Sequence, residues 1–399
     1  MQRRDPINNF VYYSPTKVLF GSGTVEQVGD CVRSFGGTHA LIVYGSERTV
    51  KSGLLMRVLM SLEKAGVGHT ALGGVVPNPR ISKVYEGIAL GQQVNADFLL
   101  AIGGGSVIDT AKAIAYGMGE PDKDVWELYA HTRTAKAMLP VGSILTIAAS
   151  GSETSNSSVL TKEDTGDKRS YNDDIARPRF AIMDPSLTLS LPDYQSMSGC
   201  ADIMMHTMER YFVNGGNLEL TDSLAEGLLR TVMAQARILH REPENLEARA
   251  EVMWAGSLAH NNLTGCGIAA GDFVCHGLEH ELGGMFDVTH GAGLTAVWGS
   301  WARYVYRDCL HRFVRYAREV MQVEPGDSDE ATALRGIEAM ENFYREIGMP
   351  TNLRELGVAP TEAQMREMAH RCAVAHGGKK GSAKVFYEED MYKVYKLAL

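Results

Sequence analysis

The chain has 399 residues, of which 45% are hydrophobic and 22% charged, and its formal net charge is −9. A disordered chain would lack the apolar area that offsets the entropy of ordering, so this composition indicates a folded protein. The acidic balance argues against bulk affinity for nucleic acid or an anionic membrane. The sequence shows no secretory leader and no apolar run of about 18 residues, so we expect a soluble, cytoplasmic protein with reduced cysteines.

The first half of the chain alternates strand and helix patterns. Residues 39–44 and 98–102 are short apolar runs typical of buried strands, and helical spacing follows each of them. Apolar strands separated by helices of about 10–15 residues are typical of a parallel sheet. Residues 10–23, in contrast, resemble an antiparallel ribbon.

The second half contains long helical patterns and almost no strand-like runs. The change falls near residues 189–195. We therefore expect an α/β domain over residues 1–192, with a mostly parallel sheet, followed by an all-helical domain over residues 193–399.

A glycine triplet, Gly103-Gly104-Gly105, followed by Ser106, stands between the apolar strand 98–102 and a helical pattern. Backbone N–H groups at such a helix start bind anions, and glycine lets a phosphate come close. The alternative is a capped helix after a tight turn, because Ser106 and Asp109 have the capping-box spacing. The usual dinucleotide fingerprint GxGxxG is absent.

Several histidines have the spacing of metal ligands. Asp202 and His206 are four residues apart in a helical pattern, as are His276 and His280, and His290 follows shortly afterwards. Imidazole and carboxylate together suit Zn²⁺ or Fe²⁺. A rival interpretation is the inverted zinc-protease motif HxxEH at residues 276–280, in which Glu279 would activate water. That hydrolase would leave Asp202 and His206 without a role.

At this point the sequence resembles the iron-containing (group III) alcohol dehydrogenases. The resemblance rests on residues 103–112, 201–211 and 276–291, and several other segments resemble the butanol dehydrogenase and broad aldehyde reductase branch. It implies a Rossmann-like dinucleotide-binding domain followed by a helical metal-binding and catalytic domain. It also implies hydride transfer between NAD(P) and a small primary alcohol or aldehyde, in a homodimer or larger oligomer. A dehydroquinate synthase-like lyase is the alternative on the same scaffold.

The resemblance also implies individual site residues. The metal ligands fall on Asp202, His206, His276 and His290, and Fe²⁺ is expected there, with Zn²⁺ as the alternative. His280 falls on a further histidine, which would relay a proton or hydrogen-bond the nicotinamide ribose. The cofactor-binding positions are Asn78, Gly104, Gly105, Ser106, Asp109, Thr146, Ser150 and Lys168.

Residues 45–48 bear on the choice between the two nicotinamide cofactors. NAD-linked members of the resembling family have an aspartate after the strand that here covers residues 40–44, and Gly45 takes its place. The open glycine, with Ser46 and Arg48 as donors to a phosphate, favours NADP(H) over NAD(H). Glu47 argues the other way, because it could serve as the missing acid.

Overall fold

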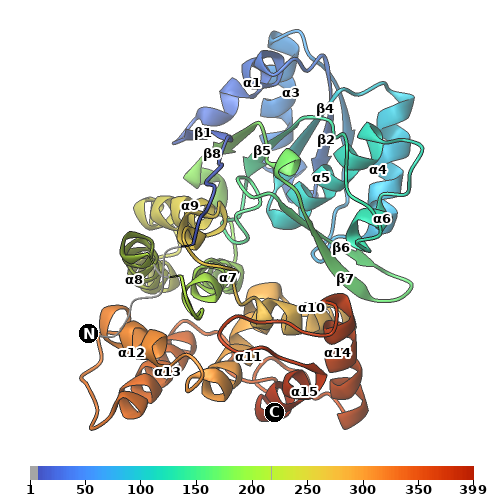
Figure 1. Ribbon diagram of the computed structural model, residues 1–399. Helices are drawn as coiled ribbons and strands as arrows, with labels where there is room; N and C mark the ends of the chain where they lie inside the picture. Colours follow the sequence, from blue (N-terminus) through green and yellow to red (C-terminus); the bar gives the residue numbers. More distant parts are fainter. Residues whose placement is uncertain (1–7, 217) are drawn as a thin grey trace. The chain divides into compact units, whose positions relative to one another are not determined.

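The computed structural model describes residues 8–216 and 218–399. They form two compact units: Ser14–Leu191 is one, and Pro192–Leu399 with the described residues ahead of Ser14 is the other (Figure 1). The predicted first domain starts at residue 1, so its first seven residues lie outside the described residues.

The first unit is built on a six-stranded sheet in the order β1-β8-β5-β4-β2-β3, in which all neighbours are parallel. The central strand β4 is buried at every position, as a strand covered on both faces should be. The parallel sheet predicted from the sequence is confirmed. The strands are β1 (Lys17–Phe20), β2 (His39–Tyr44), β3 (Gly68–Leu72), β4 (Phe98–Gly103), β5 (Val141–Leu145) and β8 (Phe180–Met183).

The predicted antiparallel ribbon over residues 10–23 is wrong. Lys17–Phe20 forms the edge strand β1 and pairs in parallel with Phe180–Met183. Its partner is so distant in the sequence that no local pattern could reveal the pairing. The antiparallel ribbon of this unit lies elsewhere, between β6 (Ser157–Lys162) and β7 (Asp167–Asn172).

Helices cover both faces of the large sheet (Figure 1). Helices α1 and α3 pack on the face that contains Ile42 and Leu100. Helix α4 packs on the opposite face, where its Gly91 lies close to Leu41. The helices of this unit are η1 (Thr24–Gln27), α1 (Val28–Ser34), α2 (Arg48–Lys51), α3 (Leu54–Lys64), α4 (Ile81–Gln93), α5 (Gly105–Gly119), α6 (Trp126–Tyr129), η2 (Asp174–Ala176) and η3 (Pro185–Thr188).

The second unit is helical in its described residues, apart from one isolated bridge between Lys380 and Phe386. Its central helix α7 is buried at every residue from Ser196 to Tyr211. The helices are α7 (Asp193–Tyr211), α8 (Glu219–Arg241), α9 (Leu246–His260), η4 (Leu263–Gly265), α10 (Val274–Phe286), α11 (His290–Val305), α12 (Leu310–Glu319), α13 (Asp329–Glu346), α14 (Glu362–Ala375) and α15 (Glu388–Leu397). Within the described chain, no helix is long and apolar enough to cross a membrane.

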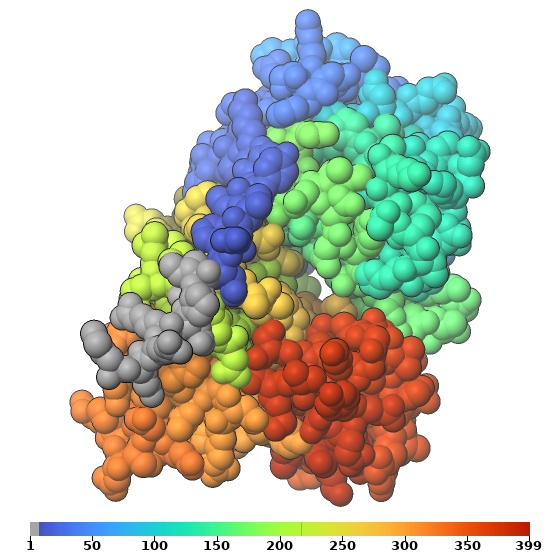
Figure 2. All heavy atoms as spheres, in the orientation of Figure 1, coloured from blue at the N-terminus to red at the C-terminus, as the bar shows by residue number. Residues whose placement is uncertain are grey.

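The described start of the chain, dark blue in Figure 2, lies on the surface of the molecule. Four large apolar or aromatic side chains are exposed there: Phe10, Val11, Tyr12 and Tyr13. Of these, Val11 is 90% exposed. The segment leads directly into the edge strand β1.

Candidate metal and cofactor sites

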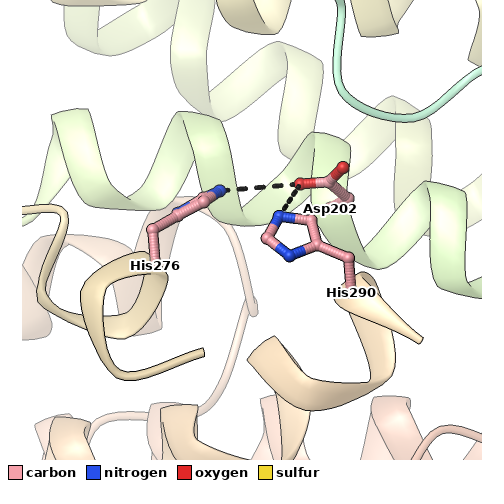
Figure 3. Close-up of side chains that lie close together, drawn as sticks. All are labelled: Asp202, His276 and His290. Atoms are coloured by element: carbon pink, nitrogen blue, oxygen red, sulfur yellow. Dashed lines mark ion pairs between the residues drawn. The ribbon is translucent and has the colours of Figure 1, made fainter. Parts of the chain in front are cut away.

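Three helices of the second unit bring four potential metal ligands together. Asp202 and His206 lie one turn apart on α7, and His206 Nε2 is 3.3 Å from Asp202 Oδ1. His276 on α10 and His290 on α11 point to the same oxygen, with Nε2 distances of 3.6 and 3.7 Å (Figure 3). Three imidazole nitrogens therefore converge on one carboxylate oxygen.

A glycine allows α11 to reach the central helix. A Cβ added to Gly291 would lie 2.0 Å from the carbonyl oxygen of Ser198, a backbone atom of α7. Because backbone cannot yield as a side-chain tip can, any larger residue would push the first turn of α11 away. Gly291 thus sets the position of its neighbour His290 against Asp202.

The converging atoms lack the hydrogen bonds that buried polar groups normally make. Asp202 Oδ1, His276 Nε2 and His206 Nδ1 are buried without a hydrogen-bond partner. Each such group costs about 1–3 kcal/mol when left unsatisfied. A cation held between Asp202, His276 and His290, whose ligand atoms all lie within 4.8 Å of one another, would remove this cost for the first two atoms. The residues present therefore fit a divalent metal ion.

Two buried glutamates orient two of the imidazoles. Glu209 on α7 accepts from His276 Nδ1, and Glu279 on α10 accepts from His290 Nδ1. An ionised carboxylate can only accept, so each Nδ1 carries a proton, and Nε2 is the nitrogen that faces Asp202 and would bind a metal ion. No role for Glu209 was predicted from the sequence. Its position three residues after His206, on the same face of one helix, was the available signal.

The electrostatic environment differs between two of the imidazoles. Burial alone would lower the pKa of His276, but the neighbouring carboxylates of Glu209 and Asp202 raise it to about 9. Burial and the neighbouring His260 hold the pKa of His206 well below its ordinary value. The acidic surroundings of His276 therefore attract a positive charge, whether a proton or a metal ion that displaces it.

Two further histidines flank this group. The ring of His280 lies 6.4 Å from that of His276 and 6.0 Å from that of His290, centroid to centroid. His280 is outside the set of three whose ligand atoms lie close together. His260, which the sequence did not single out, stacks on His206 at 3.9 Å.

The arrangement does not match the inverted zinc-protease motif. That mechanism needs His276 and His280 as paired ligands and Glu279 directed at a water molecule. Glu279 is instead completely buried and bonded to His290. The geometry therefore gives no support to the hydrolase alternative.

In the first unit, the predicted cofactor residues follow the carboxyl ends of neighbouring strands. Gly45 comes directly after β2, Gly104 after β4 and Thr146 after β5, and these strands are adjacent in the sheet. Ligands of open parallel sheets bind at this edge, where the strand order reverses. The expected cofactor positions are thus brought to one edge of the sheet.

Close packing explains the glycines at the start of α5. A Cβ on Gly104 would lie 1.9 Å from Cγ2 of Ile147, and one on Gly105 would lie 2.3 Å from Oγ of Ser150. The loop after β5 therefore lies directly against the glycine turn. Thr146 belongs to the same contact, because its backbone N–H donates to the Gly103 carbonyl at 3.1 Å.

The alternative of a capping box between Ser106 and Asp109 is not what the structure shows. Helix α5 starts one residue earlier, with Gly104 as its N-cap and no side-chain cap. Asp109 faces inward instead, where its carboxylate accepts from Ser152 Oγ at 2.6 Å and from the Val159 N–H at 3.0 Å. The first backbone N–H groups of α5 have no side-chain cap, and such groups can bind a phosphate.

A buried lysine that the sequence did not identify holds the segment beyond this loop. Lys112 of α5 is completely buried. Its Nζ donates to the carbonyl oxygens of Ser152, Ser155 and Ser157 at 2.7, 3.0 and 2.8 Å. These bonds fix the chain that follows Ser150.

The remaining predicted cofactor positions lie in several environments. Arg48 starts α2 and donates from Nη1 to the Ser190 carbonyl at 3.1 Å, and its backbone N–H donates to Ser46 Oγ at 3.4 Å. Glu47 pairs with Lys51 at 2.9 Å in an exposed ion pair. Asn78 is a buried loop residue with φ of 51°, and Lys168 is buried on β7.

Family models identify the chain. The model of the iron-containing alcohol dehydrogenases matches residues 15–185, and the C-terminal model of the same family matches residues 196–399. The chain belongs to the iron-containing alcohol dehydrogenase family. The family predicted from the sequence is therefore confirmed.

Relatives of this alcohol dehydrogenase agree with the predicted branch and fold. It is 36% identical over 389 residues to the NADH-dependent butanol dehydrogenase A of Clostridium acetobutylicum, covering 97% of this chain and 99% of the relative. It is 34% identical over 359 residues to the NADPH-dependent aldehyde reductase YqhD of Escherichia coli, covering 88% and 90%.

The structure of NADH-dependent butanol dehydrogenase A from Thermotoga maritima matches with a TM-score of 0.95 at 32% identity, covering 99% of this chain and 100% of that one. The predicted fold class, an α/β unit followed by a helical one, is confirmed. The enzyme is an NAD(P)-dependent alcohol dehydrogenase or aldehyde reductase, as the sequence predicted.

Proposed function

We propose that this enzyme interconverts small primary alcohols and aldehydes with a nicotinamide cofactor and one divalent metal ion per subunit. The observation that carries the proposal is the convergence of three imidazole Nε2 atoms on Asp202 Oδ1, at 3.3, 3.6 and 3.7 Å. The related butanol dehydrogenases and aldehyde reductase support the substrate class.

Asp202, His206, His276 and His290 are the proposed ligands. Imidazole and carboxylate bind both Fe²⁺ and Zn²⁺, and the family description favours Fe²⁺. When bound, such an ion supplies Lewis-acid polarisation of the oxygen of the alcohol or aldehyde. The hydride chemistry belongs to the nicotinamide, and the protein contributes binding and orientation.

His280 is the proposed catalytic residue. It lies on α10, one turn after His276, and its ring is near those of His276 and His290. In alcohol oxidation an imidazole nitrogen of His280 would take up the hydroxyl proton and pass it to solvent, and in aldehyde reduction it would return one. A hydrogen bond from His280 to the nicotinamide ribose is the other role open to it.

Within the predicted first domain, residues 1–192, the sheet unit Ser14–Leu191 is the proposed dinucleotide-binding part, whereas residues 8–13 group with the helical unit. Residues 193–399 form the proposed metal-binding and catalytic part. Gly104, Gly105 and Ser106 would contact the pyrophosphate at the start of α5. The other proposed contacts are Gly45, Ser46, Arg48, Asn78, Asp109, Thr146, Ser150 and Lys168. With Gly45 in place of an acid and Arg48 beside it, NADP(H) is the proposed cofactor over NAD(H).

We propose that the enzyme is a cytoplasmic homodimer or larger homo-oligomer. The exposed run from Phe10 to Tyr13 offers apolar surface to a second copy, and β1 stands at the edge of the sheet formed by the described strands, where a further strand could add. Light scattering of the purified protein measures this directly, and a monomer at micromolar concentration would contradict it.

A panel of aldehydes with NADH and NADPH tests the proposed reaction. The protein is assayed as purified, after exhaustive chelation, and again after addition of Fe²⁺ or Zn²⁺. We expect reduction of small aldehydes to be lost on chelation and restored by one of the two ions. Full activity after metal removal would contradict the proposal.

A further inference from the structure

Glu209 and Glu279 stand in the same relation to two histidines of the candidate metal site. Each is completely buried, and each binds the Nδ1 of one imidazole whose Nε2 faces Asp202. Glu209 makes a second contact, because its Oε1 accepts the backbone N–H of His276 at 3.3 Å. Burying a carboxylate costs free energy. We therefore ask what each of these carboxylates does for the imidazole that it contacts.

The fold makes room for both carboxylates. A Cβ on Gly293 of α11 would lie 2.9 Å from Glu279 Cγ and 3.4 Å from its Oε1. The missing side chain thus lets Glu279 pass from α10 to the first turn of α11, where His290 begins the helix. Glu209 needs no such gap, since it lies on α7 and meets the first turn of α10 at His276.

The third histidine provides an internal contrast. His206 Nδ1 is buried without a hydrogen-bond partner, and the His206 ring lies between those of His260 and His276, at 3.9 and 4.4 Å. It shares α7 with Asp202, so the helix itself sets its distance from that ligand. His276 and His290 come from other helices, and a hydrogen bond to Nδ1 fixes the rotation of each ring about its own axis in a way that ring packing alone does not.

We infer that Glu209 and Glu279 are positioning residues that hold His276 and His290 in the Nδ1–H tautomer with Nε2 directed at the metal. The inference rests on the proposed metal site. Acting through the imidazoles, the two carboxylates raise the basicity of Nε2 and keep the ring planes fixed. Loss of such a partner typically weakens metal binding about 10–100-fold.

The test uses the full-length protein, freed of metal and reloaded with Co²⁺ alone. Affinity is measured by competition with a chelator, and the visible absorption of Co²⁺ reports the geometry of its ligands. The variants Glu209→Gln and Glu279→Gln keep shape but remove the charge. We expect each to weaken Co²⁺ binding by about 10–100-fold and to change the Co²⁺ spectrum.

Glu281→Gln is the matched control. Glu281 is also buried and lies on α10 two residues after Glu279, and its carboxylate pairs with Arg371 at 3.1 Å. This variant should bind Co²⁺ with wild-type affinity and spectrum. If Glu209→Gln and Glu279→Gln behaved like Glu281→Gln, the inference would be wrong.

Two further variants separate the possible failures. If a Gln variant does not fold, Glu209→Asp or Glu279→Asp retains the charge but withdraws it by one methylene, and a changed Co²⁺ spectrum is expected. An unchanged spectrum in the Asp variant would overturn the inference. If wild type binds no Co²⁺, or His276→Ala binds it as wild type does, the proposed metal site itself has failed.

Discussion

The candidate metal site of the helical unit is made of side chains, whereas the candidate cofactor site of the sheet unit depends on glycines that have none. Asp202, His276 and His290 extend from three helices toward one point. Gly104 and Gly105 instead allow the loop at Ile147 and Ser150 to lie against the start of α5. A site made of side chains leaves residue types in the sequence that name its chemistry. A site made of backbone atoms is marked in the sequence only by glycines, and glycines occur at many positions for other reasons.

We expect the largest effect when a side chain of the candidate metal site in the helical unit is removed. Asp202→Ala or His276→Ala should lower activity by roughly 10³-fold or more, because Lewis-acid stabilisation is worth several kcal/mol. Metal content measured by elemental analysis should fall with it. Binding of NADPH, followed by its fluorescence, should remain. Loss of NADPH binding together with loss of the metal would contradict the assignment of metal binding to the helical unit and cofactor binding to the sheet unit.

Removing the His280 imidazole should have the next largest effect. His280→Ala should lower kcat by about 10²-fold or more and should remove one limb of the pH–rate profile, as expected of a general acid or base. His240→Ala is a suitable control, because His240 forms an ion pair with Asp193 away from the metal-site histidines. An unchanged pH profile in His280→Ala would leave His280 only the ribose-binding role.

A pair of glycine variants sharpens the contrast further. In Gly104→Ala the new Cβ meets Ile147 at 1.9 Å, and in Gly291→Ala it meets the Ser198 carbonyl at 2.0 Å. Overpacking of this kind costs about 1–3 kcal/mol. Gly104→Ala should raise the Kd of the cofactor and spare metal content, and Gly291→Ala should do the reverse. Calorimetry and elemental analysis distinguish the two, and identical effects would argue against separate sites.

The smallest expected effect concerns the choice of cofactor. Arg48→Ala should lower kcat/KM with NADPH by about twofold to fivefold and leave that with NADH unchanged, because an exposed ion pair is worth about 1 kcal/mol at most. In the structure Arg48 donates to the Ser190 carbonyl, a bond it would exchange for the 2′-phosphate. A preference for NADH that the substitution does not alter would contradict the proposed use of NADP(H).

Much of the fold was predictable because it depends on local patterns. The buried strands at 39–44 and 98–103 and the long helices after residue 193 follow from their apolar spacing. Strand β1 was not predictable in this way, since nothing in residues 17–20 indicates a parallel partner at 180–183. The sequence left the start of α5 open between a phosphate-binding turn and a capped helix, because its N-cap is Gly104, a residue with no side chain to mark it.

The candidate metal site shows a similar contrast: its expected ligands could be predicted from the sequence, but the residues that orient them could not. Residue type and spacing pointed to Asp202 and several histidines, His280 among them, and the family resemblance selected Asp202, His206, His276 and His290. In the structure the Nε2 atoms of these three histidines lie 3.3–3.7 Å from Asp202 Oδ1. Neither pointed to Glu209, because a glutamate in a helix is usually solvated and only its burial against His276 reveals the contact. Burial depends on tertiary packing, which spacing does not encode.

The parallel pairing of β1 has a consequence for the order of events during synthesis. Lys17–Phe20 leaves the ribosome early, but its partner Phe180–Met183 follows only after the rest of the sheet has been made. The partner of Asn8 is synthesised later still, because Asn8 Nδ2 donates to the carbonyl of Gly267, 259 positions further along the chain. The large sheet can therefore be completed only after most of the first unit has been translated, and until then the sequence of β1 has no strand to pair with.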